Sequence, residues 1–394
     1  MSTSVKSRLR VALLIETSNR YGRDLLHGVH DWVSAGERWS IRSVEQQRHS
    51  PPPAWLREWQ GDGIIARVDS DEIATALKRT GLPVVDVSAE RPASEFPHVG
   101  INNRAVAQMA ATHLLSKKLS NYAFCGDDRF LWSRKRGETF MQVMRAGRKS
   151  CHEFRQGNRR PAAGSAGEMD LLVNWLKQLP KPVGVFACYD ERAQKILEAC
   201  HQAGLTVPEE VAVLGVDDDE LICELCDPPL SSVLLNARRT GYEAAAILSN
   251  LMTKRAPVSL ISREIEPVRV VERHSTDAIA VNDGHVAAAL LYIREHSSDG
   301  IDVSDVLRAV PVSRTLLERK FVKLLGVSPH RLIKRHKIER VCQLLVESDL
   351  AIARVADMTG FESASYLSAA FLREKGETPR VYRARHRSTK TGKV

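Results

Sequence analysis

Most of the chain alternates short apolar runs with longer segments in which apolar residues recur every three or four positions. The runs at 11–15 and 63–66 have the length of buried strands, while Leu25, Val29 and Trp32 form the stripe of a helix that is buried on one face. Strands that alternate with helices in this way predict parallel sheets covered by helices on both faces. Ligands are expected at the carboxyl ends of such strands.

The same alternation continues to about residue 271. Further strands are expected at 82–87, 122–125, 183–188, 211–216, 228–233 and 268–271, and further helices at 107–115, 140–144, 191–203 and 240–252. The elements from 107 onward are expected to form a second unit of the same kind, which the helix at 240–252 and the strand at 268–271 complete. The pattern therefore predicts an α/β body of two doubly wound lobes.

Beyond residue 285 the pattern becomes wholly helical. Residues 303–310, a turn at Pro311 and residues 313–325 predict one helix-turn-helix, after which Ser328 caps and Pro329 opens a long helix. About 20 helical residues span about 30 Å, close to the roughly 34 Å between successive major-groove faces of a duplex. One chain can therefore present two recognition helices to neighbouring turns of the groove.

The second helix-turn-helix begins at residue 352. Gly360 is expected to supply the left-handed turn residue and Ser363 the next helix cap, while Leu367 and Phe371 bury one side of that helix. An ordinary helical hairpin is the alternative. The run through Gly360, Tyr366, Phe371, Pro379 and Tyr382 resembles the signature of the arabinose-regulator (AraC-type) transcription factors, which implies DNA binding.

Charge supports that assignment. Residues 285–394 hold 20 Lys and Arg against 12 Asp and Glu, a net +8, whereas residues 1–284 hold 37 against 36, a net +1. Such an excess is expected of a segment that neutralises phosphates, although part of it lies in a basic tail that solvent alone can accommodate.

Four motifs in the α/β part resemble the ligand-sensing core of lac-repressor-type regulators and periplasmic sugar-binding proteins. They are Asp190 with Arg192-Ala193, the segment 204–211, Gly215-Val-Asp-Asp218 and the segment 228–233. The resemblance implies a periplasmic-binding-protein-like sensor over 8–273 with a sugar cleft between its lobes. A polar linker at 274–284 and an all-α DNA-binding domain with two helix-turn-helix units at 285–390 follow.

Both parts together resemble the xylose-operon regulators, which fuse such a sensor to an AraC-type domain. Trp132-Ser-x-x-Arg136, Phe124-Cys-Gly126, the segment 187–192 and the segment 217–229 carry this resemblance. It implies a sugar-responsive regulator, a xylose-dependent activator of pentose genes, that binds a double-stranded operator as a homodimer. An activator would also contact RNA polymerase.

A pentose offers adjacent hydroxyls to charged groups and a C–H face to an aromatic ring. Asp217, Asp190 and Arg136 are the candidates for the first role, and Trp132 and Tyr21 for the second. The alternative is that Asp190 caps the following helix and that Asp218 and Asp219 are solvated loop charges. A phosphorylated sugar stays open as the ligand, because Arg134 and Arg136 are both available to a phosphate.

On the first recognition helix, Leu317, Phe321 and Leu324 are expected to face the core. By resemblance, Thr315, Glu318 and Arg319 occupy base-facing positions, and Arg314 and Lys323 are expected to contact phosphate. The exposed side of the second recognition helix carries Ala364, Ser365 and Ser368. Ala369 stands where relatives can have a base-reading arginine, so direct readout there is expected to be weaker and DNA shape more important.

Other classes of function find little support. We find no Walker loop, GxGxxG, GxSxG elbow or HExxH, and Cys223-Glu-Leu-Cys226 lacks the second ligand pair of a zinc site. Neither a metal nor another cofactor is expected. No apolar run has the length of a membrane helix and no signal core follows Met1, so we expect a cytoplasmic protein. A constitutive DNA-binding protein with a degenerate sensor, and a sugar-processing enzyme, remain the alternatives.

Overall fold

A computed structural model describes residues 8–36, 39–43, 50–88, 96–154, 166–254, 262–277, 283–296, 300–325 and 327–391. The chain divides into two compact units, Met1–Ala280 and Val281–Val394, and each unit has hydrophobic cores of its own. None of the helices within the described ranges combines the length and the apolarity that crossing a membrane requires.

The first lobe of the sensor unit is a parallel sheet in the order β11-β5-β4-β3-β1-β2. Its strands are β1 (Leu9–Leu14), β2 (Trp39–Ser43), β3 (Gly63–Ala66), β4 (Val84–Asp86), β5 (His98–Ile101) and β11 (Ser262–Ile265). Alternate residues of these strands enter two different cores, because successive side chains of a strand point to opposite faces. Val11 packs with α1 (Arg20–Ser34) and α8 (Ala237–Lys254), whereas Ala12 packs with η1 (Ala54–Glu58) and α2 (Asp71–Thr80).

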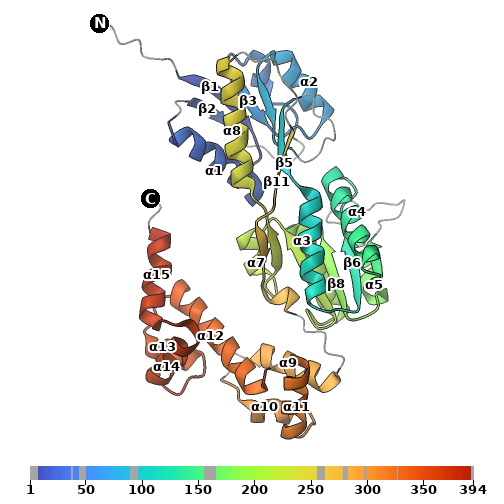
Figure 1. Cartoon of the computed structure of the whole chain (residues 1–394), viewed down its shortest axis with the longest axis vertical. Coiled ribbons are helices and arrows are strands. Elements are labelled where there is room, and N and C mark those ends of the chain that lie inside the picture. The colour runs from blue at the N-terminus through green and yellow to red at the C-terminus, as the bar shows by residue number, and fades with distance from the viewer. Residues whose placement is uncertain are drawn as a thin grey trace. The chain divides into compact units, whose positions relative to one another are not determined.

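The second lobe is a sheet in the order β12-β10-β9-β8-β6-β7, in which β12 pairs antiparallel with β10. Its strands are β6 (Asn121–Cys125), β7 (Cys151–Phe154), β8 (Val183–Ala187), β9 (Val211–Val216), β10 (Ser231–Leu234) and β12 (Arg269–Val271). One face is covered by α3 (Asn103–Ser116) and α4 (Leu131–Ala146). The other is covered by α5 (Ala166–Gln178), α6 (Asp190–Ala203) and α7 (Glu220–Leu225). The predicted pair of doubly wound lobes is confirmed (Figure 1).

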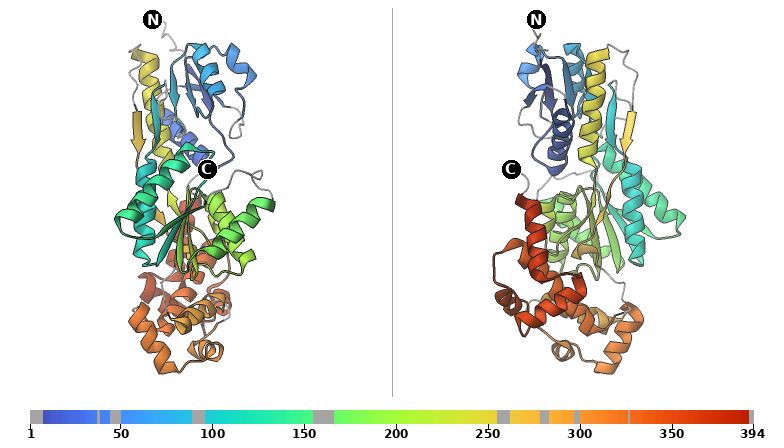
Figure 2. Two further views of the ribbon diagram at one scale, coloured as in Figure 1. Left: turned by 90° about the vertical axis from the view of Figure 1, so that its right-hand side faces the viewer. Right: turned by 60° about the vertical axis from the view of Figure 1, so that its left-hand side comes forward.

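The expectation that the helix at 240–252 completes the second lobe is wrong. This helix is α8, and its Ala244, Ala245 and Leu248 share a core with Leu25 and Val29 of α1 in the first lobe. Figures 1 and 2 show α8 (yellow) beside the blue first lobe in every view. The chain thus returns to the first lobe for α8 and β11 and then crosses back to the second lobe for β12, the last strand of the sensor unit. Helical periodicity reports which face is buried and carries no information on which sheet buries it.

The two lobes are joined by crossing segments that are bonded to one another. Asn102, between β5 and α3, donates its backbone N–H to Ile265 O (2.9 Å) and its side-chain amide to Glu266 Oε1 (2.8 Å). Ile265 ends β11, from which the chain returns to the second lobe. A third crossing leads from β10 to α8, and there Leu234 O accepts from Val268 N (2.9 Å), so the three crossings form a bonded hinge.

The second unit is helical and contains two small cores that share one long helix. Its helices are α9 (Gly284–His296), α10 (Val303–Ala309), α11 (Arg314–Leu325), α12 (Pro329–Glu347), α13 (Ile352–Met358), α14 (Ala364–Lys375) and α15 (Pro379–Thr391). The first core includes Leu317, Phe321 and Leu332, and the second includes Leu345, Leu367 and Phe371. The 19 residues of α12 span about 28 Å at roughly 1.5 Å per residue, in line with the predicted spacing of two recognition helices.

The predicted caps and turns of this unit are confirmed with one correction to the core. Ser328 Oγ accepts from Arg331 N (3.3 Å), Ser363 Oγ accepts from Tyr366 N (3.1 Å), and Gly360 has a φ of 63°. Leu324 was expected to face the core but is 39% exposed. It lies in the last turn of α11 and borders a surface hollow, whereas its neighbour Leu325 packs against the core.

Candidate ligand cleft and DNA-binding surface

The carboxyl ends of the strands bring the predicted ligand residues to one place between the lobes. Two cavities, of about 20 Å³ and 30 Å³, share Tyr21 and Asp217. The smaller is lined by Asn19, Arg20, Tyr21, Tyr189, Asp190, Glu191, Asp217, Asp219 and Ile222, and the larger by Tyr21, Arg67, Ile101, Trp132, Arg136, Asp217 and Leu235. All five predicted ligand residues therefore border these cavities.

Asp217 is the first residue after β9, and the backbone there is strained. Its φ is 106° and that of Asp218 is 51°, conformations that L-residues rarely adopt and that tend to occur at functional sites. The strand neighbour holds this loop: Asp217 N donates to Val233 O (3.0 Å) and Asp218 N to Ser232 Oγ (3.0 Å). The loop is thereby fixed with the Asp217 side chain at both cavities.

Arg136 of α4 forms part of the cleft wall. Its Nε donates to Asn103 Oδ1 (2.9 Å) and its Nη1 to Cys188 O (2.5 Å), and its guanidinium lies 4.6 Å from the centre of the Trp132 ring. Burial lowers the pKa of Arg136, and the nearby Asp217 carboxylate opposes that change. Arg136 and Trp132 therefore form a rigid wall that offers both a cation and an aromatic ring.

Tyr21 contributes a hydroxyl that lacks a partner. The oxygen is buried, and no hydrogen-bond partner exists for it among the described residues. Burial raises the pKa of Tyr21 to about 12, so the phenol stays protonated and can donate. Buried polar groups in native proteins are almost always hydrogen-bonded, so an orphaned hydroxyl in a cavity points to a missing partner.

Asp190 borders the cavity but is already engaged by its own lobe. Its carboxylate accepts from Asp219 N (2.7 Å) and from Ser232 Oγ (2.6 Å), and Cys223 Sγ lies 3.6 Å away. Burial, together with the nearby Asp217, raises the pKa of Asp190 well above its usual value. The alternative that Asp190 caps α6 is wrong, because it is the first residue of that helix and makes no capping bond.

The alternative that Asp218 and Asp219 are solvated loop charges is also wrong. Both side chains are buried, Asp218 at 5% exposure, and both face arginines. Arg67 and Glu16, which follow β3 and β1, were not predicted, yet they form a buried ion pair beside Tyr21. The rule that ligands lie at the carboxyl ends of strands applies to both residues and was sufficient to find them.

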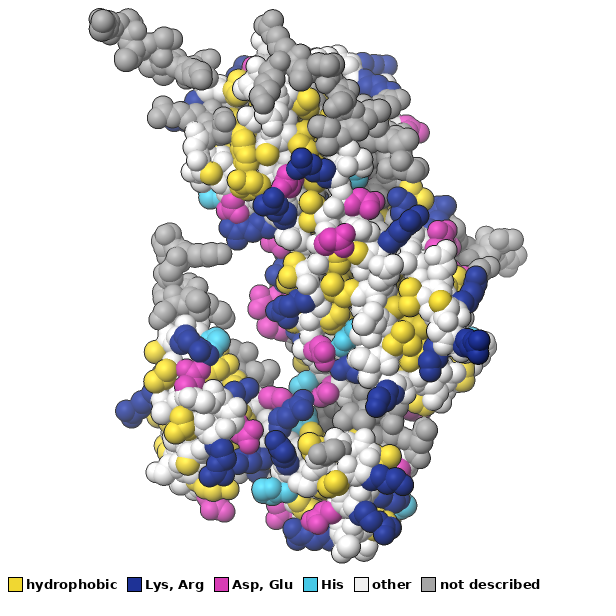
Figure 3. All heavy atoms as spheres, viewed as in Figure 1, with side chains coloured by type: hydrophobic (Ala, Val, Ile, Leu, Met, Phe, Trp, Pro, Cys, Tyr) yellow, Lys and Arg dark blue, Asp and Glu magenta, His cyan; other side chains and the backbone are white. Residues whose placement is uncertain are grey.

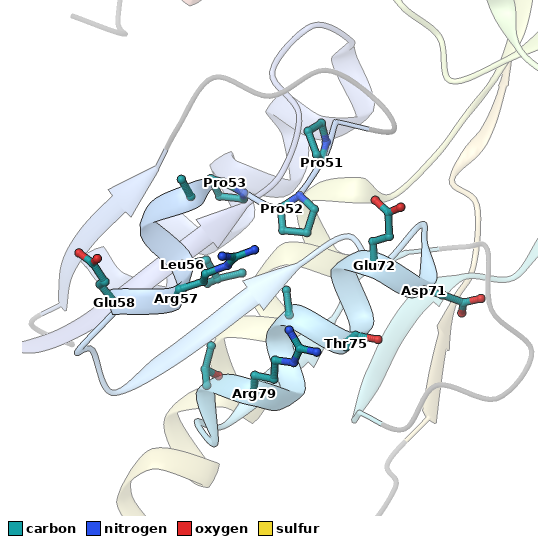
Figure 4. A pocket seen from close by; sticks show the side chains of 13 residues that line it. Pro51, Pro52, Pro53, Leu56, Arg57, Glu58, Asp71, Glu72, Thr75 and Arg79 are labelled. Atoms are coloured by element: carbon teal, nitrogen blue, oxygen red, sulfur yellow. The ribbon is translucent and has the colours of Figure 1, made fainter.

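A much larger hollow lies elsewhere on the first lobe. It measures about 1160 Å³ and lies between η1 and α2 (Figure 4). Arg57 and Glu58 border it from η1, and Glu72 and Arg79 border it from α2, all of them exposed. It shares no residue with the cleft between the lobes, and exposed charged rims are an ordinary feature of a protein surface.

The first recognition helix, α11, presents most of its predicted DNA-binding residues to solvent. Arg314, Thr315, Arg319 and Lys323 are exposed, and Glu318 is half-buried. Arg314 Nε donates to Glu318 Oε1 (3.0 Å), which leaves the terminal nitrogens of this guanidinium for a phosphate. Figure 3 shows Lys and Arg side chains (dark blue) on the visible face of this unit.

Lys320, which the sequence did not single out, ties α11 to the start of α9. Its Nζ lies 2.7 Å from Asp283 Oδ2 and 3.3 Å from His285 Nδ1. The hydrogen bond from Lys320 lowers the pKa of Asp283. A surface hollow of about 490 Å³ adjoins Asp283 and Lys320 as well as the candidate DNA contacts Arg319 and Lys323.

The second recognition helix, α14, presents small groups. Ser365 is exposed, whereas Ala364 and Ser368 are half-buried. Ser368 Oγ donates to Ala364 O (2.7 Å), so its hydroxyl is used within the helix. Ala369 is exposed, so this surface has an alanine at the position where a base-reading arginine can occur. This surface permits a close approach of backbone to DNA and offers few groups that read bases.

Three family models match successive parts of the chain. A model described as the XylR N-terminal domain matches residues 10–104, a periplasmic binding protein-like domain matches 111–276, and a helix-turn-helix domain matches 306–385. The matches have the same order as the two lobes and the helical unit. They place the chain among transcription regulators and not among sugar-processing enzymes.

Relatives match almost the whole length. The xylose operon regulatory protein of Escherichia coli is 33% identical over 95% of this chain and 97% of its own, and that of Haemophilus influenzae is 31% identical over 95% and 98%. A solved structure described as the xylose-binding transcription activator xylR has a TM-score of 0.81 at 31% identity and covers 96% of this chain and 98% of that one. The chain therefore belongs to the family of xylose operon regulatory proteins, transcription regulators with a periplasmic-binding-protein-like sensor and a helix-turn-helix domain.

Proposed function

We propose that this protein is a transcription activator that binds D-xylose between the two lobes of its sensor and thereby changes its affinity for operator DNA. The observation that carries the proposal is the cavity shared by Tyr21 and Asp217, where a buried hydroxyl for which the described residues supply no partner borders the same space as a carboxylate on a strained loop. Sugar hydroxyls both donate and accept, so one sugar can accept from the Tyr21 hydroxyl and donate to the Asp217 carboxylate. Xylose itself is suggested by the solved relative, which is described as xylose-binding.

The charges of the cleft favour a neutral sugar over a phosphorylated one. The buried cations have acidic neighbours: Arg67 pairs with Glu16, and Arg136 lies near Asp217. Arg134, a candidate phosphate ligand from the sequence, is exposed and donates to Asp128 O from Nε (3.2 Å) and Nη2 (2.9 Å). A dianionic phosphate would add its charge beside these carboxylates, which already neutralise the neighbouring arginines in the described part of the cleft.

Binding requires the lobes to move. Cavities of about 20 Å³ and 30 Å³ each have room for about one water molecule and not for a pentose. The bonds of the hinge at Asn102 and Ile265 lie within the crossing segments and can persist during such a movement, whereas the bonds from Arg20 and Arg23 to the Asp218-Asp219 loop have to open. A sugar that favours one spacing of the lobes shifts the equilibrium toward that spacing.

In the cell, the proposed arrangement is a sensor at 8–273, a linker at 274–284 and a DNA-binding domain at 285–390. Two copies of the chain bind the operator in the cytoplasm as a homodimer, and activation proceeds through contact with RNA polymerase. On α11, Arg319 reads a base edge together with Thr315 and Glu318, while Arg314 and Lys323 bind phosphate. On α14, Ala364, Ser365 and Ser368 fit the second half-site.

The test is a comparison of ligands by isothermal calorimetry on the full chain. D-xylose is expected to bind, with weaker binding of ribose, arabinose, glucose and xylose 5-phosphate. Operator duplexes are then selected from a random library in the presence of D-xylose, and their affinity is measured with and without the sugar. Absence of pentose binding supports the degenerate-sensor alternative, and chemical conversion of the bound sugar, followed by mass spectrometry, supports an enzyme.

A further inference from the structure

Asp218 contacts three parts of the sensor unit that are distant in the sequence. It follows Asp217, which lines the cavities, whereas Asp218 itself lines neither of them and its buried carboxylate lies between Arg20 and Arg273. Arg20 begins α1 in the first lobe, and Arg273 follows β12 at the root of the linker. One side chain therefore touches the cleft loop, the opposite lobe and the exit of the sensor.

The contact with the first lobe depends on the spacing of the lobes. Arg20 Nη1 donates to Asp218 O and lies 3.3 Å from Asp218 Oδ2. Arg20 N also donates to Asp219 Oδ2 (3.2 Å), and Arg23 Nη2 lies 3.5 Å from that oxygen. When the lobes separate, these bonds must lengthen or break, because Arg20 and Asp218 belong to different lobes.

The contact with the linker root is independent of the first lobe. Arg273 Nη1 donates to Asp218 Oδ1 (2.7 Å) and to Leu230 O (3.0 Å). Its backbone N–H donates to Ser231 Oγ (2.8 Å), which in turn donates to Arg273 O (2.9 Å). The next described turn, η2 (His274–Thr276), is bonded to the same lobe, with Ser275 Oγ donating to Val213 O (2.6 Å).

We infer that the Asp218–Arg273 ion pair is the positioning contact that transmits a change in the distance between the two lobes to the linker. The inference rests on the proposed function, since it needs a sugar that changes the spacing. When Arg20 leaves Asp218, that carboxylate loses one of its two cationic partners, and Arg273 is left to compensate its buried charge alone. The position of Arg273, and of the chain that leaves the sensor behind it, then differs between the open and closed forms.

The experiment compares Arg273→Gln with a matched control, Arg269→Gln, in the full chain. Arg269 lies on β12 four residues earlier, and its side chain is exposed. Calorimetry gives the D-xylose affinity without DNA, and fluorescence anisotropy with a duplex selected by the wild type gives the operator affinity with and without sugar. The measured quantity is the ratio of the two operator affinities, for which couplings between sites are typically about 5- to 150-fold.

Arg273→Gln is expected to bring that ratio to within about twofold of unity while the D-xylose affinity changes by less than about threefold, because Arg273 lines neither cavity. Arg269→Gln is expected to keep the wild-type ratio, and Arg273→Lys, which retains the charge, to recover most of it. A merely structural role would lower stability in Arg273→Gln without altering the ratio of the folded protein.

A wild-type ratio in a folded Arg273→Gln protein overturns the inference and leaves the proposed function standing. Should that variant fail to fold, Asp218→Asn breaks the same ion pair from its other end and is expected to reduce the ratio of operator affinities. A wild-type ratio in Asp218→Asn also overturns the inference. A wild-type protein that binds D-xylose with no change in operator affinity overturns the inference as well as the regulatory part of the proposed function.

Discussion

Gly300 and Gly360 lie backbone against backbone in the helical unit. A Cβ atom on Gly360 would lie 2.1 Å from Gly300 Cα, and both residues have positive φ, 76° and 63°. Gly300 precedes α10 of the first helix-turn-helix, and Gly360 is the turn between α13 and α14 of the second. Lys337 of α12 completes the contact, since its Nζ donates to Gly360 O (3.1 Å). Together they fix the spacing of the two recognition helices.

Gly360→Ala is therefore expected to destabilise the second helix-turn-helix by about 2 kcal/mol or more, since a left-handed residue and a backbone clash both contribute. Gly376→Ala is the control: its φ is 75°, but nothing lies within 4 Å of a new Cβ, so about 1 kcal/mol is expected. Hydrogen exchange followed by mass spectrometry reports the opening of α13 and α14 in the full chain. Equal effects of the two replacements would remove the clash from the explanation.

Arg319→Ala is expected to weaken operator binding by about 1 to 3 kcal/mol and to relax specificity at one base pair, as for loss of a bidentate base contact. Lys323→Ala serves as its partner variant on the same helix and is expected to weaken all sequences alike. Both side chains are exposed, so folding is not at issue. Affinities for single-base operator variants decide between the roles, and an unchanged affinity in Arg319→Ala would exclude base reading by this residue.

Asp217→Asn is expected to weaken D-xylose binding by roughly 1.5 to 3 kcal/mol, the range for a hydrogen bond to a charged group. The replacement keeps the shape of the side chain and removes its charge. Asp170→Asn, on the exposed face of α5, is the control and is expected to bind like the wild type. Calorimetry measures both, and wild-type affinity in Asp217→Asn would show that the carboxylate does not face the sugar.

Tyr21→Phe is expected to separate stability from ligand binding. The variant removes a buried hydroxyl that has no partner among the described residues, so the sugar-free protein keeps or gains thermal stability while D-xylose binding weakens by about 0.5 to 1.5 kcal/mol. Tyr122→Phe shows the reverse pattern, because that hydroxyl donates to Leu119 O (2.9 Å) within the core. A Tyr21→Phe protein that loses stability and binds sugar normally would contradict the assignment.

The pKa of His113 determines how the stability of the protein is expected to change with pH. Burial lowers its pKa from 6.5 to about 4, Lys117 adds to that effect and Glu272 opposes it, and Nε2 lies 2.9 Å from Thr276 Oγ1. Between these two values the unfolded chain binds more protons than the folded one, so stability falls as pH falls from about 6.5 to about 4. His113→Gln is expected to flatten this part of the stability profile in denaturant titrations, and His201→Gln, exposed on α6, to leave it unchanged.

The sequence predicted elements better than their assignment to lobes. Apolar runs located strands such as 63–66 and 211–216, and local signals such as Ser328, Ser363 and Gly360 located helix boundaries, because both depend on neighbours in the chain. The position of α8 depends on a tertiary contact with α1, for which the sequence contains no local signal.

Much of the candidate cleft could be predicted from the rule that ligands bind at the carboxyl ends of parallel strands. This rule placed Asp217 at the cleft, where the structure has it. The burial of Asp218 and Asp219 could not be predicted in the same way. It arises from Arg20, Arg23 and Arg273, which lie far from them in sequence, and only the folded chain brings their guanidinium groups to this loop. Ion pairs between residues that are so far apart in the sequence leave no periodic pattern from which they could be predicted.

The return of the chain to the first lobe has a consequence for synthesis on the ribosome. β5 pairs with β11 along one edge, yet more than half of the sensor is translated between them. Until residue 265 has emerged, the nascent first lobe exposes an unpaired parallel strand and the apolar surface that α8 later covers. Open edges and apolar faces of this kind promote aggregation, so the first lobe is most at risk of it while the second lobe is being translated.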